Sequence, residues 1–187
     1  DQILKFIIPK GFFIPVSPGT KNVTIGGSIA CDVHGKNHHN NGSFGAHILE
    51  IKLIDGNAND KILRPNDPDI NLQNQFWATI GGMGLTGIIY EAKFKLIEIE
   101  TSLVSVDTFR YKDLNSLMKA MIKVDKKYNY SVAWIDPLHS NKRGILTCGN
   151  HAKENQVKDK QKLKYKTKTI NLIPSFLPNG LINKFTV

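Results

Sequence analysis

The sequence has little of what marks several common classes of protein. Among 187 residues there are only two cysteines, Cys31 and Cys148, and they form no CxxC pair. This argues against a disulfide framework and against a zinc ribbon, so we expect two reduced thiols. No apolar run approaches the length of a membrane span. With 41% hydrophobic and 22% charged residues, the composition is that of a soluble globular protein.

The chain also lacks the usual signals at its ends. It starts "DQILKFIIPKGFF", with no initiator methionine and no signal-peptide pattern. It stops in apolar sequence, "LINKFTV". We therefore expect an internal fragment of a longer protein. The compartment stays open between a cytoplasmic and a periplasmic location, with or without membrane association.

Negative charge is scarce as well, because 16 Asp and Glu face 25 Lys and Arg, a formal net charge of +9. More than half of this excess lies in a run that begins at Lys153 and ends at Lys168, where seven lysines and two acids carry +5. Such a run is typical of a solvated loop, or of a segment that contacts an anionic partner such as lipid headgroups. Only Tyr165 interleaves the lysines, and no nucleic-acid motif is recognisable, so we expect no nucleic-acid partner.

What the sequence does have is one segment, residues 24–48, that gathers glycine and histidine. The stretch "TIGGSIACDVHGKNHHNNGSFGAHI" holds five of the 15 glycines and four of the six histidines. A metal site is one interpretation, since His34 and His38 are spaced i, i+4. The stretch between them is too rich in glycine and asparagine for a stable helix, and no HExxH or Cys–His cluster accompanies it. We therefore expect no metal.

Two other interpretations of this segment stay open on the residues alone. The first is a polar loop whose histidines are structural. The second is a phosphate or dinucleotide site, because Gly26 and Gly27 present bare backbone amides ahead of a short apolar helix over residues 28–33. In that case Gly35 and Gly45 would let a flat ligand approach the backbone.

Periodicity predicts the elements of the first hundred residues. Alternation predicts a hairpin over residues 46–65 with a loose turn. A helical period predicts a helix over residues 67–80, capped by Asp67 or Asp69. A half-buried strand is predicted over residues 88–100. The side chains that share one face of this strand are Ile88, Tyr90, Ala92, Phe94 and Leu96.

The pattern changes near residue 100, and we place a domain boundary there. Strands are predicted over residues 102–109, 130–136 and 143–149. Residues 112–128 have the pattern of an amphipathic helix. Its predicted inward side chains are Leu114, Leu117, Met118 and Met121.

Three blocks of the sequence carry a resemblance, because they occur in one order with similar gaps. They are "PVSPGTKNVTIGGSIACDVHGKNHHNNGSFGAHI", "FWATIGGMGLTGII" and "YSVAWIDPL…RGILTCGNHA". Together they resemble the FAD-linked oxidases of the vanillyl-alcohol-oxidase-type fold. Within that family the chain is most similar to the subgroup that oxidises polyprenylphosphoryl ribose, to which the "HGKNHH" and "FWATIGG" blocks are specific. The resemblance covers nearly the whole chain.

The resemblance implies an α+β fold in two parts. Residues 1–100 would be the second part of the FAD-binding domain, with the pyrophosphate-binding glycine loop upstream. Residues 101–187 would be the start of an antiparallel-sheet substrate domain. The segment with the family's catalytic lysine would follow downstream, so the 187 residues alone are expected to be inactive.

The resemblance also implies FAD bound without a covalent link. The matching positions lie along the phosphates and the ring of the cofactor, mostly in the glycine–histidine segment. They are Gly19, Thr24, Ile25, Gly26, Gly27, Cys31, Asp32, Val33, His34 and Ile88.

For the reaction itself, the resemblance places His34 and Lys36 at the border between the flavin and the sugar pocket. His34 is a candidate helper base, and Lys36 is a candidate charge beside a phosphate or the reduced flavin. Trp134 matches an aromatic wall of the pocket. Val132 stands where one related enzyme has serine, which puts one polar contact in question. The remaining histidines of the segment are expected to be structural: His38, His39 and His47.

The implied activity is oxidation of a sugar hydroxyl, in particular the 2′-hydroxyl of polyprenylphosphoryl ribose, to the keto sugar. A separate NAD(P)H-dependent reductase would complete the epimerisation, which supplies an arabinan precursor for cell-wall biosynthesis. The lysine run would make a peripheral membrane contact. Two alternatives stay open: an aldonolactone or other sugar-alcohol oxidase of the same fold, and a non-catalytic basic binding module.

Overall fold

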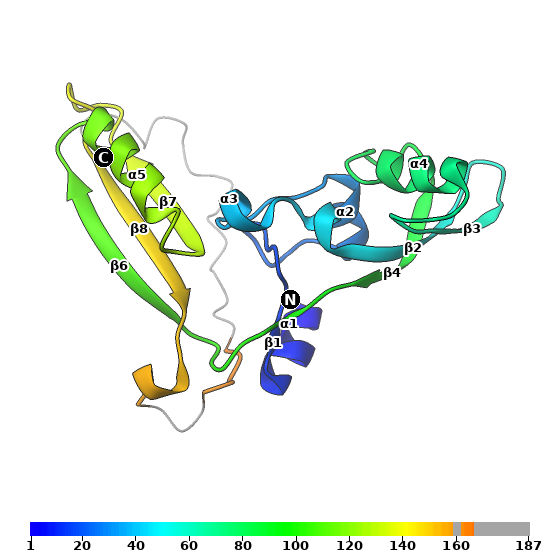
Figure 1. Ribbon diagram of the computed structural model, residues 1–187, viewed down its shortest axis with the longest axis horizontal. Helices are drawn as coiled ribbons and strands as arrows, with labels where there is room; N and C mark the ends of the chain where they lie inside the picture. The colour runs from blue at the N-terminus through cyan, green and yellow to red at the C-terminus, as the bar shows by residue number, and fades with distance from the viewer. Residues whose placement is uncertain (159–161, 167–187) are drawn as a thin grey trace, which may run out of the picture.

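A computed structural model describes residues 1–158 and 162–166, and it combines short helices with antiparallel sheets (Figure 1). The expected α+β class is confirmed. The helices are α1 (Gln2–Ile7), α2 (Ile25–Ala30), α3 (His38–Asn41), α4 (Ile70–Thr79) and α5 (Leu114–Val124). The strands are β1 (Phe12–Phe13), β2 (Ile48–Ile54), β3 (Asp60–Leu63), β4 (Ile88–Phe94), β5 (Ile97–Glu98), β6 (Val104–Tyr111), β7 (Tyr130–Ile135) and β8 (Gly144–His151).

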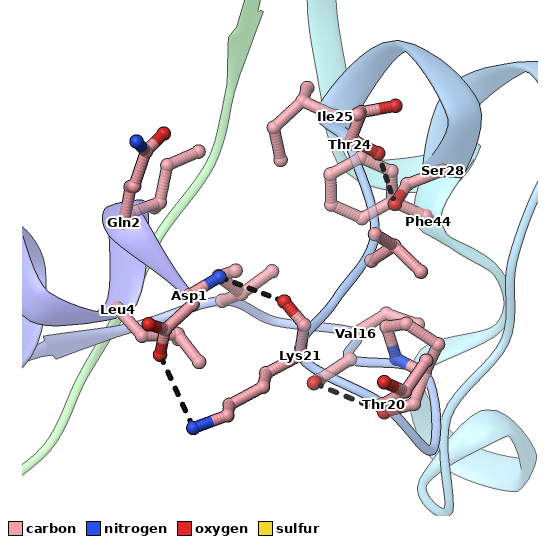
Figure 2. A pocket seen from close by; sticks show the side chains of 15 residues that line it. Asp1, Gln2, Leu4, Val16, Thr20, Lys21, Thr24, Ile25, Ser28 and Phe44 are labelled. Atoms are coloured by element: carbon pink, nitrogen blue, oxygen red, sulfur yellow. Dashed lines mark hydrogen bonds and ion pairs between the residues drawn. The ribbon is translucent and has the colours of Figure 1, made fainter. Parts of the chain in front are cut away.

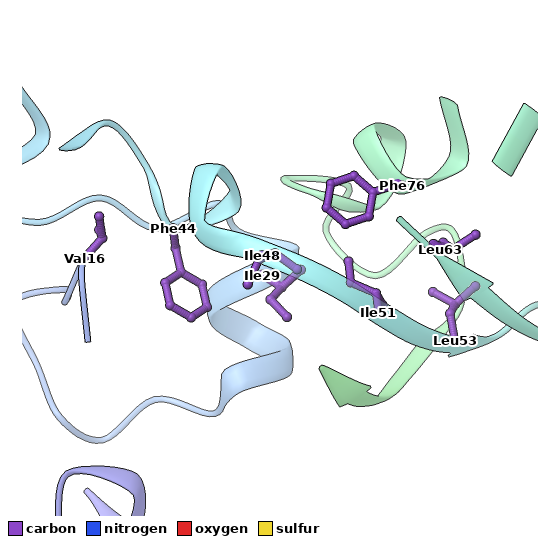
Figure 3. Close-up of a cluster of buried hydrophobic side chains, with 8 residues drawn as sticks. All are labelled: Val16, Ile29, Phe44, Ile48, Ile51, Leu53, Leu63 and Phe76. Carbon is purple, nitrogen blue, oxygen red and sulfur yellow. The ribbon is translucent and has the colours of Figure 1, made fainter. Parts of the chain in front are cut away.

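The first sheet has the order β3-β2-β4, and all its pairs are antiparallel. The predicted hairpin is confirmed as β2 and β3, and the carboxylate of Asp55 closes their turn by accepting the amides of Asn57 and Asn59. The predicted helix is confirmed as α4, which begins after the N-cap Asp69. Helices α2 and α4 cover the first sheet with a cluster of buried side chains (Figure 3). The cluster consists of Val16, Ile29, Phe44, Ile48, Ile51, Leu53, Leu63 and Phe76.

The face predicted for the strand over residues 88–100 is partly wrong. Lys52 pairs with Glu91 but Leu53 pairs with Ile89, so Tyr90 is an extra residue, a β-bulge. The bulge reverses the alternation before it, because side chains point to opposite faces in turn. Ala92 and Phe94 pack on the first cluster as predicted, together with Ile89, which was not predicted to do so. The side chains that are exposed instead are Ile88 (71%), Tyr90 (49%) and Leu96 (38%).

The second sheet has the order β6-β8-β7 and confirms the three predicted strands. Helix α5 packs on one face of it, over a smaller buried cluster of Leu117, Tyr128, Leu146 and Cys148. Leu114 and Met121 pack against this cluster as predicted, but Met118 is 55% exposed. Leu114, Leu117 and Met121 lie on the face of the helix that meets the sheet. Met118 lies at the edge of that face, where its side chain points past the sheet into solvent.

A small sheet pairs β1, which precedes the first sheet in the chain, with β5, which lies between β4 and β6 (Figure 1). Part of the lysine run packs here: Leu163 and Tyr165 contact the buried cluster of Leu4, Ile7, Ile8 and Ile99. The amide of Ser102 also donates to the carbonyl of Lys162 at 2.7 Å. This part of the run is therefore docked rather than a freely solvated loop, while residues 159–161, 167 and 168 of the run lie outside the described residues. The domain boundary near residue 100 stays a prediction.

No helix among the described residues is long and apolar enough to cross a membrane.

Candidate cofactor and substrate site

Thr24, the first residue of the expected phosphate stretch, lies at the start of α2. It is the N-cap of this helix, and its hydroxyl accepts the amide of Gly27 at 3.0 Å. The expectation of two free glycine amides is therefore wrong for Gly27, because the cap of the helix already engages it. In the part of the chain that the structure describes, the amides of Ile25 and Gly26 have no acceptor. Two donors remain available at the helix start.

A cavity of about 270 Å³ opens beside this helix start (Figure 2). Thr24 and Ile25 line it from α2, and Pro18 and Thr20 line it from the preceding loop. Between these two loop residues, Gly19 is exposed, and a Cβ built on it would meet nothing within 4 Å. The loop and the helix start therefore leave room for a ligand at the positions that the resemblance assigned to FAD.

Strand β4 passes close to α2 and brings Ile88 into the same region. A Cβ built on Gly26 would lie 3.7 Å from the carbonyl oxygen of Ile89, so the helix and the strand are in contact. The Ile88 side chain lies outside the first cluster and is exposed to solvent. The structure thus brings together the separate sequence blocks that hold Thr24, Gly26 and Ile88.

Residues 31–33 follow α2 and serve mainly to fold the segment. Asp32 adopts the left-handed region at φ 43°, and its carboxylate accepts the amide of Gly45 at 2.8 Å. Val33 packs against the first cluster, while Cys31 is an exposed free thiol. The side chains of Asp32 and Val33 are engaged by the protein, so contacts of these residues with a ligand would come from the backbone.

The interpretation that Gly35 and Gly45 admit a flat ligand is wrong. A Cβ on Gly35 would lie 2.7 Å from the carbonyl oxygen of Ser17, and one on Gly45 would lie 2.3 Å from a methyl of Ile80. Both glycines are buried. Their small size lets two parts of the chain pack together, and it leaves no space there for a cofactor.

His34 and Lys36 lie in the turn that leads into α3, and both residues are exposed. The His34 ring meets the His38 ring edge-on, with 5.4 Å between centroids. The carbonyl of Lys36 accepts the amide of Ser131, on β7, at 3.0 Å. This hydrogen bond brings Lys36 to the strand that carries Val132 and Trp134, although the two segments are far apart in the sequence.

Val132 and Trp134 lie on the face of the second sheet that α5 leaves open, and Trp134 is 71% exposed. Across β7 and β8, Val132 pairs with Thr147 and Trp134 pairs with Ile145. Directly paired residues share a face, so Thr147 places a hydroxyl beside Val132, which has none. Sequence reasoning did not find Thr147, because only the strand register reveals its neighbour.

Tyr130 and His151 share the same open face and were also missed as a pair. The Tyr130 hydroxyl lies 3.0 Å from His151 Nε2, and the Phe13 ring meets the His151 ring edge-on at 5.2 Å. Burial raises the pKa of Tyr130 and lowers the pKa of His151, which favours the neutral form of both side chains. They form a neutral polar contact where β1 meets the second sheet.

The other histidines of the segment bond to backbone carbonyls. His38 Nδ1 lies 3.1 Å from the oxygen of Gly35, His39 Nε2 lies 3.1 Å from that of Tyr128, and His47 Nε2 lies 2.9 Å from that of Asn41. Among residues 1–158 and 162–166, no group of three or more His, Cys, Asp or Glu side chains is placed to hold a metal ion. These three contacts agree with the expected structural role.

The start of α2 and the loop at Gly19 together fit one part of a dinucleotide cofactor. The fit rests on the two amides at the start of α2, the open space at Gly19 and the adjacent cavity. Ligand pockets generally span roughly 300–1,000 Å³, so a cavity of about 270 Å³ takes a portion of such a molecule.

Comparison with known proteins places the chain beside an oxidase. It is 40% identical over 197 aligned residues to the decaprenylphosphoryl-beta-D-ribose oxidase of Mycolicibacterium smegmatis. This alignment covers 100% of the chain and 41% of that protein. The resemblance expected from the sequence blocks is confirmed. The chain is also 34% identical over 154 residues to an uncharacterized protein in the mprA 5′ region of Streptomyces coelicolor, covering 81% of this chain and 40% of that protein. It therefore spans about two fifths of each relative. No protein-family model matches the chain.

Proposed function

We propose that the full-length protein is an FAD-dependent oxidoreductase that oxidises a sugar hydroxyl. The observation that carries this proposal is the 40% identity, over the whole chain, to a protein named as an oxidase of a decaprenylphosphoryl sugar. The geometry supports it, because Thr24 lines a cavity and Gly26 of the same helix lies against Ile89, the neighbour of Ile88 in β4. The carbonyl of Lys36 also bonds to the strand that carries Trp134. Activity is attributed to the full-length protein, of which this chain supplies two neighbouring parts.

In this proposal residues 1–100 belong to a vanillyl-alcohol-oxidase-type FAD-binding domain and residues from 101 onward begin a substrate domain. The start of α2 and the loop at Gly19 hold FAD without a covalent link. When bound, FAD supplies the hydride acceptor, and the protein orients the sugar. The remaining proposed backbone contacts come from residues 31–34.

Two exposed side chains face the proposed reaction from the turn before α3. His34 is the helper base for the sugar hydroxyl, because a neutral imidazole has one ring nitrogen that can accept a proton. Lys36 holds a substrate phosphate as a point charge. Trp134 and Val132 form the wall on the opposite side, and the exposed indole of Trp134 gives the sugar ring a flat apolar surface.

The proposed substrate is polyprenylphosphoryl ribose, and the proposed product is its 2′-keto sugar. This finer assignment is supported by the name of the mycobacterial relative and by an apolar wall close to a lysine. A separate NAD(P)H-dependent reductase would complete the epimerisation.

A peripheral membrane contact is proposed for the run from Lys153 to Lys168. Four of its five described lysines are exposed and can approach anionic headgroups: Lys153, Lys158, Lys164 and Lys166. Flotation of the full-length protein with neutral and anionic vesicles tests this contact. Equal binding to both kinds of vesicle would contradict it.

The test of the proposed function is a visible absorption spectrum of the full-length protein, including any segments outside these 187 residues. A flavin band that bleaches with polyprenylphosphoryl ribose is the expected result. A band that bleaches only with an aldonolactone or a free sugar alcohol would keep the chemistry and change the substrate. No flavin, even after FAD is added, would overturn the proposal and favour a basic binding module. Flavin released into the supernatant after acid precipitation is the expected sign of non-covalent binding.

A matched pair of variants ties the flavin band to the α2 cradle. Thr24→Ala removes the hydroxyl that caps Gly27, so we expect a lower flavin content in the purified protein. Thr24→Ser keeps a capping hydroxyl and should retain the flavin. Equal flavin content in both variants would place the cofactor elsewhere.

A further inference from the structure

The turn at α3 is held from both sides, and its contacts span distant parts of the chain. On one side, the buried side-chain amide of Asn37 donates to the carbonyl of Pro15 at 2.8 Å. On the other side, the turn reaches residues 125–131 of the second sheet, beside which α3 lies in Figure 1. The amide of Ser131 donates to the carbonyl of Lys36, and His39 Nε2 lies 3.1 Å from the carbonyl oxygen of Tyr128.

His39 is largely enclosed where the turn meets residues 125–131. Only 14% of the side chain is exposed. A carbonyl oxygen can only accept a hydrogen bond, so Nε2 of His39 carries the hydrogen and donates to the carbonyl of Tyr128. Asp125 lies beside the contact: its Oδ1 is 3.8 Å from the same nitrogen, beyond hydrogen-bonding distance, and accepts the hydroxyl of Ser131 at 2.8 Å. His39 and Ser131 thus lie on either side of one carboxylate oxygen, which bonds to Ser131.

The junction sets a spacing within the proposed site. Lys36 lies one residue before the anchor Asn37 and three residues before His39. Ser131, its partner, lies one residue before Val132. The spacing between Lys36 and the wall at Val132 therefore depends on the contacts of this turn with Tyr128, of which His39 makes the shortest at 3.1 Å and Asn40 a longer one at 3.4 Å. A shift of about 1 Å in such a spacing is enough to change catalysis strongly.

We propose that His39 is a positioning residue that holds Lys36 at its working distance from the wall on β7. It acts through the backbone of residues 128–131 and does not itself touch the substrate. The proposal rests on the proposed function for its kinetic consequence, but the docking contact itself is independent of it.

The test compares His39→Ala, His39→Gln and a matched control, His47→Ala, in the full-length protein. His47 Nε2 also lies near a backbone carbonyl, that of Asn41, but within its own part of the fold. The readouts are KM and kcat with polyprenylphosphoryl ribose, flavin content, and hydrogen exchange at the Ser131 amide. His39→Asn, which is polar but too short to reach Tyr128, replaces His39→Ala if that variant does not fold.

Because alanine cannot donate a hydrogen bond to Tyr128, we expect KM to rise about tenfold in His39→Ala, while kcat and flavin content stay within about twofold. Exchange at Ser131 should accelerate in the same variant. His39→Gln keeps an N–H donor and should restore both readouts, and His47→Ala should change neither. The proposal is overturned if His39→Ala changes neither readout, if glutamine behaves like alanine, or if His47→Ala raises KM equally.

Failure of the proposed function gives a different pattern. In that case the wild-type protein binds no flavin or oxidises no sugar, and the exchange measurement alone decides the docking contact. Faster exchange at Ser131 in His39→Ala but not in His47→Ala then supports the docking of residues 128–131 by His39. Unchanged exchange in His39→Ala overturns it.

Discussion

The two three-stranded sheets are built alike but use their faces differently. The first sheet, with α2 and α4, encloses eight buried hydrophobic residues, including Phe44 and Phe76. The second sheet, with α5 alone, encloses four and leaves an apolar face open to solvent. That open face carries Val104, Val106, Trp134 and Ile145.

This difference separates two kinds of contact in the candidate site, backbone contacts from the first sheet and side-chain contacts from the second. The first sheet supports loops whose glycines pack tightly, so it presents backbone amides and carbonyls in fixed places. The second sheet presents side chains on a firm strand surface. The turn at α3 joins the two, and the proposed cofactor and substrate contacts fall on either side of it. Four changes, taken in order of their expected effect on stability, test this division.

Phe76→Ala should be the most damaging change. Phe76 is completely buried in the first cluster, so its truncation should lower the free energy of unfolding by about 3–5 kcal/mol. Urea unfolding of the full-length protein measures the loss. Phe6→Ala is the matched control, since Phe6 is 65% exposed and should cost far less. Similar losses in both variants would mean that the first cluster does not dominate stability.

Gly45→Ala should be the next most damaging change. The added methyl would lie 2.3 Å from a methyl of Ile80 and 2.8 Å from the carboxylate of Asp32, so one neighbour must move. We expect a loss of about 1–3 kcal/mol in the free energy of unfolding, as for other overpacked sites. Gly56→Ala, which meets nothing within 4 Å, should be close to neutral. A thermal melt of each variant decides, and a neutral Gly45→Ala would reopen the space there for a ligand.

Asp113 should give the second sheet a modest acid sensitivity. Its carboxylate accepts the amide of Ser116 at the start of α5, which lowers the pKa of Asp113 from the ordinary 3.8. A lowered pKa in the folded state means that this stabilisation is present above that ordinary value and falls away as the pH drops through the folded pKa.

Asp113→Asn keeps a cap but cannot titrate, so it isolates this effect. We expect the urea midpoint of the wild-type protein to exceed that of the variant near neutral pH. The difference should shrink as the pH falls below about 4. A difference that stays constant over this range would show that the carboxylate does not supply the acid sensitivity.

Trp134→Ala should have the smallest effect on stability and still impair the proposed reaction. The side chain is 71% exposed, so the change in unfolding free energy should stay within about 0.5 kcal/mol. KM for the sugar substrate should rise, because the variant lacks the aromatic wall of the proposed pocket. Trp77→Ala, a half-exposed tryptophan on α4, should leave KM unchanged. A large loss of stability in Trp134→Ala would assign this residue to the core instead.

Most elements were predictable from local pattern, and the errors have identifiable causes. The hairpin of β2 and β3 follows from alternation, and α4 follows from a helical period with an Asp cap, because both signals lie within a few residues. The face of β4 was misjudged since the bulge at Tyr90 depends on its partner strand. The glycines at 35 and 45 were assigned to a ligand because the sequence cannot show that Ser17 and Ile80 fill those places.

The amino-acid sequence alone specifies the elements, the resemblance to an oxidase and the segment that carries most of the candidate cofactor residues. These depend on periodicity and on short blocks of consecutive residues, which local chemistry specifies. Which blocks meet is settled by the folded chain: Ile89 beside Gly26, Thr147 beside Val132, and Lys36 against Ser131. Such pairings depend on strand register and on contacts between residues far apart in the chain, and no local pattern encodes them.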